Sequence, residues 1–368
     1  MNLDEAIQFM TNEIVLILSC NKPTIYLYGS VVLDDFKLGW SDIDILVLTE
    51  SEITEEQASK LVNLRQNMLE RYPGNPYFRL FEGGMLSAEA FINNKTERTV
   101  YWGTGGQRIT DSYKVDSLGM AELLDSGVLL HGDDIRDKMI YPLYAQMRDD
   151  IARHVQAARK HGVVVGWLLD IARGIYTLRT GKIIAKTAAG EWALENNLCP
   201  DADAMQKTIQ CRKEAHFMKE KSIDNSIIQR FADVIDAEFA NTAERFAQSE
   251  LQRMNIAYDT LSLIRNKDGV SVWRVNSDNG SVVMKCFDKQ EYRREIANYQ
   301  LLKSLGVPTL EFIAHTDCSF IMEDIEHSKY RLATEKDTSD PNTAIKIARW
   351  YKTLHQNGRD YANTHPMF

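Results

Sequence analysis

The sequence predicts an α/β (α+β) first domain over residues 1–145, an all-α domain over 146–250 and a small α+β domain over 251–368. Three observations lead to this division. Helical periodicity alternates with short apolar runs in the first part, long periodic runs with few glycines fill the second, and β-branched runs separated by Asn/Asp/Gly turns fill the third. A chain of 368 residues is long enough for three such domains.

In the first domain, apolar residues at helical spacing alternate with short runs typical of buried strands. The expected elements are a helix over 3–19, strands over 25–28 and 43–48, a helix over 55–71 and a strand over 77–86. Residues 87–145 are mixed, with a glycine-rich turn at 102–106 and an apolar helix ending near His131.

Residues 146–248 are expected to be helical throughout. In the third domain, two turns rich in Asn, Asp and Gly separate three short strands, and one helix interrupts the series. The expected elements are strands over 260–265, 270–275 and 281–287, a helix over 290–304, and strands over 310–315 and 320–322.

The composition is that of a globular protein with an acidic balance, since 44% of the residues are hydrophobic, 26% are charged and the formal net charge is −9. This charge disfavours a nucleic-acid partner, which usually needs a basic surface. No apolar run has the length of a membrane span, and the N-terminus lacks the features of a signal peptide. The five cysteines are widely spaced, so we expect reduced thiols in a cytoplasmic protein.

Two carboxylates stand two residues apart at the second predicted strand. Asp42 and Asp44 share one face because side chains alternate along a strand. Two acids on a buried strand are costly unless a cation neutralises them, and a metal ion is the natural partner. A third carboxylate from a neighbouring strand would complete the site, with Glu82 as the first candidate and Glu89 as the second. The alternative is a solvent-facing edge strand with ordinary surface acids.

The turn Gly29-Ser30 closes the first strand, where a glycine allows backbone N–H groups to approach a phosphate and the serine hydroxyl can donate to it. Residues 25–30 and 39–47 together resemble the signature of the polymerase-β-type nucleotidyltransferases. The closer resemblance is to aminoglycoside adenylyltransferases of the streptomycin/spectinomycin type. It extends into the helical part at residues 171–176 and 180–193.

This resemblance implies a two-domain enzyme that moves AMP from ATP to a hydroxyl of a small molecule, with two Mg²⁺ ions in the cleft. Asp42, Asp44 and Glu82 would bind metal, and Glu82 would also be the catalytic base. Gly29, Ser30, Arg173 and either Lys182 or Lys186 would contact the nucleotide. The alternative is a structural role: the lysines would only interact favourably with the dipole of a helix end, and Arg173 would pair with Asp170.

The sequence also departs from that family. Residues 83–86 and 95–125 have no counterpart in the drug-modifying enzymes, so the drug pocket cannot be transferred. A pocket for polycationic aminoglycosides should be acidic, and Glu89, Glu122 and Asp170 are candidates to line it.

Residues 255–368 resemble the N-terminal lobe of small-molecule kinases such as aminoglycoside phosphotransferases. Lys285 would contact a nucleotide, and Glu295 would hold that lysine in an ion pair. Only thirteen residues follow His355, and they include no H-x-D-x-x-x-x-N loop. We expect a lobe without phosphotransfer, in a shortened chain or as a remnant, with an exposed apolar face that favours a homodimer.

Three other functions remain open from the sequence. A phosphotransferase with an accessory first domain is disfavoured by the missing catalytic loop. A nucleotide-binding regulator without transferase activity is disfavoured because all three expected carboxylates have candidates. The acceptor could instead be a protein or a nucleic acid, and the acidic charge argues against the second.

Overall fold

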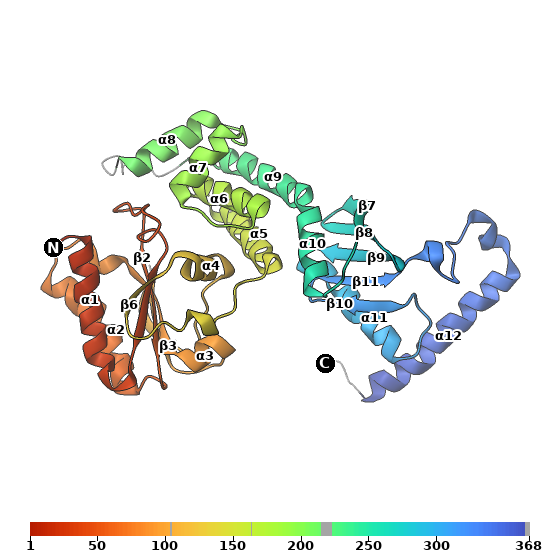
Figure 1. The fold of residues 1–368 in the computed structure, drawn as a ribbon, viewed down its shortest axis with the longest axis horizontal. Helices are drawn as coiled ribbons and strands as arrows, with labels where there is room; N and C mark the ends of the chain where they lie inside the picture. Colours follow the sequence, from red (N-terminus) through yellow and green to blue (C-terminus); the bar gives the residue numbers. More distant parts are fainter. Residues whose placement is uncertain (104, 163, 215–222, 365–368) are drawn as a thin grey trace. The chain divides into compact units, whose positions relative to one another are not determined.

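The structure is a computed structural model that describes residues 1–103, 105–162, 164–214 and 223–364. Its internal contacts divide the chain into two compact units, Met1–Asp236 and Ala237–Phe368 (Figure 1). The division into three domains proposed from the sequence remains a prediction. None of the described helices is long and apolar enough to cross a membrane.

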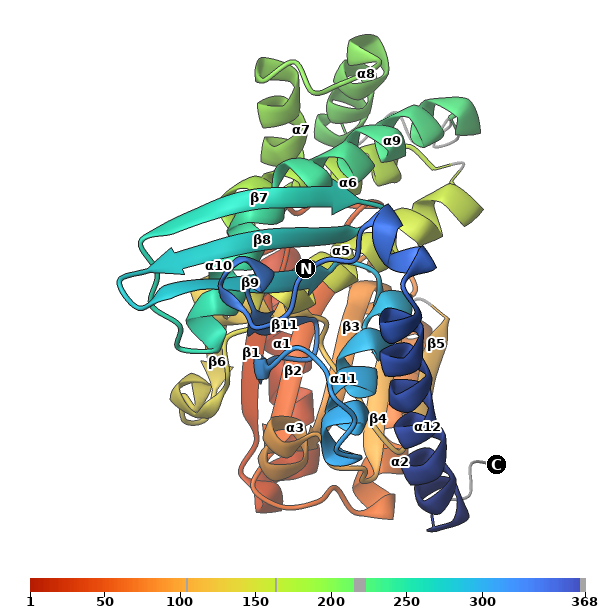
Figure 2. The ribbon, with the colours of Figure 1, turned by 90° about the vertical axis from the view of Figure 1, so that its right-hand side faces the viewer.

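The first unit contains a six-stranded sheet in the order β5-β4-β3-β2-β1-β6 (Figure 2). Strands β2 and β3 are parallel, and the other neighbours are antiparallel. The strands are β1 (Thr24–Tyr28), β2 (Ile43–Thr49), β3 (Phe81–Ser87), β4 (Thr99–Gly103), β5 (Gly106–Thr110) and β6 (Val128–His131). The strands predicted over 25–28 and 43–48 are confirmed, because their β-branched and apolar residues suit the centre of a sheet.

Two apolar clusters cover the two faces of this sheet. On one face, helices α1 (Leu3–Leu18) and α2 (Glu55–Arg71) pack against Ile25 and Leu27 of β1. On the other, α3 (Ala88–Asn93) and α4 (Ser117–Ser126) pack near Tyr26 and Tyr28. Successive residues of β1 therefore point to opposite clusters, which is why all five of its residues are buried.

Two sequence expectations in this unit are corrected. The strand expected over 77–86 begins only at Phe81, because residues 78–80 form a 3₁₀ turn. The apolar run before His131 was expected to be helical, but α4 ends at Ser126 and Val128–His131 pairs with β1 as strand β6. The glycine-rich piece joins β4 to β5; its Thr104 lies outside the described residues.

Helices follow the sheet, as predicted for residues 146–248. They are α5 (Tyr144–His161), α6 (Gly166–Thr180), α7 (Lys186–Glu195), α8 (Ala202–Lys213), α9 (Asn225–Asn241) and α10 (Ala243–Arg253). Helix α6 contacts α5, α7 and α8. The glycine at 174 lets α6 lie close to α5 and α9, since an added Cβ there would meet Ile151 on α5 and Ile235 on α9.

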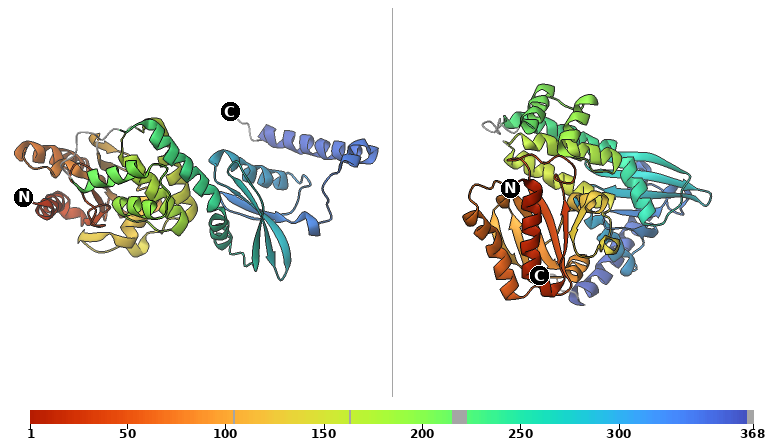
Figure 3. Two further views of the ribbon diagram at one scale, coloured as in Figure 1. Left: turned by 90° about the horizontal axis from the view of Figure 1, so that it is seen from above. Right: turned by 60° about the vertical axis from the view of Figure 1, so that its left-hand side comes forward.

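The second unit contains α10 and a five-stranded antiparallel sheet in the order β10-β11-β9-β8-β7 (Figure 3). Its strands are β7 (Thr260–Lys267), β8 (Val270–Ser277), β9 (Gly280–Phe287), β10 (Phe312–His315) and β11 (Ser319–Glu323). Helix α11 (Arg294–Ser304) lies between β9 and β10 in the chain, and α12 (Pro341–Thr364) follows the sheet. The predicted order of three strands, one helix and two strands is confirmed, while the likeness to a kinase lobe stays a prediction.

The carboxylate of Glu250, on α10, is completely buried in the second unit. It accepts hydrogen bonds from the side chains of Thr316 and Cys318, in the turn between β10 and β11, and of Ser319, the first residue of β11. It also pairs with Arg253 at 3.0 Å. These contacts attach α10 to the sheet through a fully satisfied buried acid.

Candidate active site

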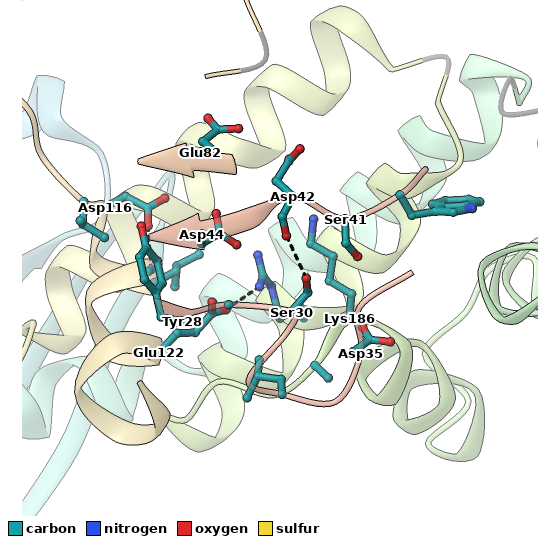
Figure 4. Close-up of a pocket in the computed structure, with 18 of the residues that line it drawn as sticks. Tyr28, Ser30, Asp35, Ser41, Asp42, Asp44, Glu82, Asp116, Glu122 and Lys186 are labelled. Carbon is teal, nitrogen blue, oxygen red and sulfur yellow. Dashed lines mark hydrogen bonds and ion pairs between the residues drawn. The ribbon is translucent and has the colours of Figure 1, made fainter. Parts of the chain in front are cut away.

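Strand pairing brings two of the predicted carboxylates together. Asp44 lies opposite Tyr28 on β1 and opposite Glu82 on the parallel strand β3. Side chains at paired positions point to the same face of a sheet, and Asp42 belongs to that face because it precedes Asp44 by two residues. All three carboxylates lie around the same cavity (Figure 4).

This cavity has a volume of about 400 Å³ and lies entirely within the first unit. Its walls come from the ends of β1 to β3, the loop between β1 and β2, helix α4, and residues of α6, α7 and α8. Gly29, Ser30, Arg173 and Lys186 line it together with the three carboxylates. Of the two lysines proposed from the sequence, the structure brings Lys186 to the cavity, whereas Lys182 is exposed and does not line it. Glu89 is exposed too and pairs with Lys95 outside the cavity.

The turn at Gly29 requires a glycine for two reasons. Its φ is +72°, a left-handed conformation that side chains disfavour. A Cβ at this position would also overlap the carboxylate of Asp44. The backbone of the turn therefore lies directly against Asp44. The next residue, Ser30, donates its hydroxyl to the carbonyl oxygen of Asp42 at 3.4 Å, which connects the turn to the start of β2.

Burial is the main influence on the ionisation of the three predicted carboxylates. Burial raises the pKa of Asp44, and the neighbouring Glu122, Asp42 and Glu82 raise it further, to about 8. Burial also raises the pKa of Asp42 and of Glu82. Such a group of acids disfavours its own ionisation and attracts a cation.

Carboxylate oxygens are the ligands that Mg²⁺ prefers, so the chemistry of these donors fits a magnesium ion. The present side-chain positions do not yet form a complete site. Within the described part of the chain, no three His, Cys, Asp or Glu side chains lie close enough together to hold a metal ion. The carboxylates around the cavity would have to converge on the ion as it binds.

Glu82 is held by a tyrosine. The hydroxyl of Tyr101, on β4, donates to Glu82 Oε1 at 2.8 Å, and the ring of Tyr101 lies beside that of Tyr113, with centroids 5.7 Å apart. Burial raises the pKa of Glu82, while this hydrogen bond lowers it. The carboxylate is thus oriented at the cavity wall, in a position where it could accept a proton.

The positive side of the cavity is an ion network on three helices. Arg173, on α6, lies 2.7 Å from Glu122 on α4 and 3.6 Å from Asp170 on its own helix. Lys186, at the start of α7, lies 2.8 Å from the same Asp170. The pairing of Arg173 with Asp170 was anticipated as an alternative from their spacing, whereas its shorter contact with Glu122 was not.

A second buried network escaped the sequence reasoning. Asp35, in the loop after Ser30, accepts hydrogen bonds from the backbone N–H and hydroxyl of Thr187, and from Arg212 on α8. Asp35 and Arg212 are 5% and 3% exposed. This network attaches the loop between β1 and β2 to α7 and α8. Asp35 lies more than 150 positions from Thr187 and from Arg212 in the sequence, so no local pattern indicates these contacts.

Two protein-family models match parts of the chain. Residues 13–74 match the family model of the nucleotidyltransferase domain, and residues 142–238 match that of the aminoglycoside adenylyltransferase C-terminal domain. No curated protein sequence matches the chain.

Among solved structures, the chain is similar to a spectinomycin adenyltransferase from Enterococcus faecialis, crystallised with ATP and spectinomycin. The identity is 15%, the alignment covers 64% of this chain and 100% of the other, and the TM-score is 0.47. The two family matches support a transferase: the chain is similar to the nucleotidyltransferase domain over residues 13–74 and to the aminoglycoside adenylyltransferase C-terminal domain over residues 142–238.

Proposed function

We propose that the chain is a magnesium-dependent adenylyltransferase that moves AMP from ATP to a hydroxyl of a small molecule of the aminoglycoside or aminocyclitol class. The observation that carries the proposal is the meeting of Asp42, Asp44 and Glu82 at one cavity with the Gly29-Ser30 turn. The nucleotidyltransferase match over residues 13–74 covers the first two carboxylates and the turn.

In the proposed reaction, Asp42, Asp44 and Glu82 would hold magnesium, and the ion would supply neutralisation of charge on the triphosphate. The backbone at Gly29 and the basic side chains Lys186 and Arg173 bind phosphate oxygens. Glu82 takes the proton of the acceptor hydroxyl as its oxygen attacks the α-phosphorus. The new bond joins that oxygen to the α-phosphorus, the α–β bridge bond breaks, and pyrophosphate leaves.

The family match over residues 142–238 and the charge of the cavity support this acceptor class. The cavity wall includes Asp116 in addition to the three proposed metal ligands, and also Glu122, which is paired with Arg173. An acidic wall favours an amine-bearing acceptor over an anionic one. The formal net charge of −9 is likewise unfavourable to a nucleic-acid acceptor.

The experiment is a pyrophosphate-release assay with Mg²⁺, ATP and a panel of aminoglycosides and aminocyclitols, with mass spectrometry of the acceptor. We expect release that requires both the acceptor and Mg²⁺, and an acceptor heavier by one AMP. The double variant Asp42→Asn/Asp44→Asn should lose this activity, because loss of metal carboxylates raises the barrier by several kcal/mol. Glu89→Gln, outside the cavity, is the matched control. Nucleotide binding without release for any acceptor would refute the drug-modifying activity.

For the second unit, a nucleotide contact at Lys285 is a separate proposal. Lys285 Nζ lies 2.5 Å from Glu295 Oε1, which is the ion pair expected from the sequence. The variant Lys285→Met, made in the Asp42→Asn/Asp44→Asn background, should abolish any ATP binding that this background retains. Unchanged residual binding in the triple variant would refute the contact.

A further inference from the structure

Two cations that line the cavity share one carboxylate behind them. Asp170 Oδ1 lies 2.8 Å from Lys186 Nζ and 3.6 Å from Arg173 Nη2. Both cations line the cavity, whereas Asp170 does not and is only 22% exposed at its side chain. Asp170 therefore contacts the rear of the basic wall and does not face the cavity.

The position of Lys186 is not explained by the stability of its helix. Lys186 is the first residue of α7, where the helix dipole is positive and disfavours a cation. The N-cap residue, Ala185, offers no side-chain cap, and the backbone N–H of Thr187 is capped from outside by Asp35. Another contact must compensate for a lysine at this end, and Asp170 supplies it.

Asp170 also lies between two like charges, of which Arg173 is the less solvated. Arg173 is 15% exposed at its side chain, so its repulsion of Lys186 is weakly screened. Burial raises the pKa of Asp170, but the charges of Lys186 and Arg173 lower it by more, which keeps the carboxylate ionised between them. Without that charge, the long stem of Lys186 would let its ammonium group move out to solvent.

We propose that Asp170 is a positioning residue for the nucleotide, which holds Lys186 beside Arg173 so that the ammonium group of Lys186 faces the triphosphate. The inference rests on the proposed function, because it takes the ligand of these cations to be ATP. An ammonium group has three N–H donors, so Lys186 can donate to a phosphate oxygen while it keeps its contact with Asp170. Asp170 itself touches no reacting atom.

The test is the binding of Mg–ATP to the full chain by isothermal titration calorimetry, for the native protein, Asp170→Asn, Lys186→Gln and the double variant. We expect Asp170→Asn to weaken binding about tenfold, a size typical of coupled neighbouring charges. In the Lys186→Gln background the same substitution should weaken binding by at most about threefold, because the cation it positions is gone. In the transfer assay, KM for ATP should rise with the dissociation constant, and kcat should change less than about twofold.

Two further variants separate positioning from a general structural role. Asp170→Glu keeps the charge and should restore most of the binding. Glu191 lies on α7, as Lys186 does, and pairs with Lys213 at an exposed position. Glu191→Gln removes this pair and should leave binding unchanged. Thermal unfolding verifies that each variant is folded. If Asp170→Asn alone does not fold, the double variant is compared with Lys186→Gln, and the two should bind ATP alike.

Equal binding by the native chain and a folded Asp170→Asn would overturn the inference and leave the proposed function intact. A tenfold loss that persists in the Lys186→Gln background would overturn it as well, because Asp170 would then act on something other than Lys186. Failure of the native chain to bind Mg–ATP would refute the proposed function, and the inference would fall with it.

Discussion

The guanidinium of Arg212, on α8, lies 3.1 Å from the carboxylate of Asp35, in the loop that connects β1 to β2. Both side chains are almost completely buried, and Arg212 also donates to the hydroxyl of Ser41, the neighbour of Asp42. One buried ion pair thus joins the helical part of the first unit to the loop between β1 and β2. That loop begins with the candidate phosphate-binding turn and ends at Asp42, the first candidate metal ligand.

Removal of one partner of this pair should destabilise the first unit strongly. Asp35→Ala leaves the charge of Arg212 buried without its partner, and we expect a loss of about 3–5 kcal/mol in the free energy of unfolding. Urea unfolding followed by circular dichroism measures it. Glu191→Ala breaks an exposed pair with Lys213 and should cost less than about 1 kcal/mol. Equal costs for the two variants would contradict the role of the buried pair.

The same carboxylate should make stability depend on pH. Burial raises the pKa of Asp35, but the hydrogen bond from Thr187 and the charge of Arg212 lower it by more, so the net shift is downward. A depressed pKa stabilises the fold above the unfolded-state value of about 4, and this contribution is lost as the pH falls through the folded-state value. The difference in Tm between the native chain and Asp35→Asn should therefore be largest near neutral pH and shrink in acid. A difference that stays constant from pH 7 to pH 3 would argue against the assignment.

Substitution of Gly29 should damage the site more than the fold. Gly29→Ala places a Cβ against the Asp44 carboxylate at a φ of +72°. The strained backbone costs about 1–2 kcal/mol, and displacement of Asp44 should lower turnover by roughly 100-fold. Gly74→Ala is the control, since a Cβ there meets no atom within 4 Å. Full activity of Gly29→Ala would show that the turn does not have to approach Asp44 closely.

Loss of the tyrosine hydroxyl at Glu82 should shift the pH dependence of turnover. Tyr101→Phe removes a hydrogen bond that lowers the pKa of Glu82, so burial then raises that pKa further. If Glu82 must be ionised to accept a proton, the acid limb of kcat/KM should move to higher pH by about one unit. Tyr141→Phe, which removes a similar bond to Asp125 outside the cavity, should leave the profile in place. A shift in the opposite direction would exclude Glu82 as the base.

Magnesium should stabilise the native chain through Asp44. In the metal-free protein this buried carboxylate lies among three other acids, so Asp44→Asn should raise Tm by a few degrees, or about 1 kcal/mol. Added Mg²⁺ should raise the Tm of the native chain and of Glu89→Gln, but not that of Asp44→Asn. Differential scanning fluorimetry with EDTA or Mg²⁺ measures both effects. An equal response of Asp44→Asn to Mg²⁺ would place the ion elsewhere.

Period-two alternation was sufficient to predict that Asp42 and Asp44 share a face, and the length and composition of the apolar runs were sufficient for β1, β2 and the strands of the second unit. These are local properties of the sequence, and the folded chain adopts the structure that they favour wherever tertiary packing agrees with it. The alignment of Asp44 with Glu82 depends on parallel pairing between β2 and β3, and the sequence could only suggest it. The roles assigned to these residues remain predictions.

The pairing of Arg173 with Glu122 and of Arg212 with Asp35 could not be predicted from the sequence. Glu122 and Arg173 are 51 positions apart, and Asp35 and Arg212 are 177 apart. Nothing in the neighbourhood of these residues distinguishes an acid that will be buried against a cation from one that will face solvent. Only the packing of α4, α6 and α8 around the cavity determines which acids are neutralised and which are left for a cation.

The buried Glu250 determines where the second unit can be excised for separate expression. A fragment that begins after Met254 would lack α10, and the hydroxyl groups of Thr316 and Ser319 would lose the acceptor that they share. Such a fragment would expose to solvent the part of the sheet that α10 covers, together with these two hydroxyl donors. A cleavage site or an affinity tag placed near Asn241, before α10 begins, would leave the helix and its anchoring acid with the sheet that they complete.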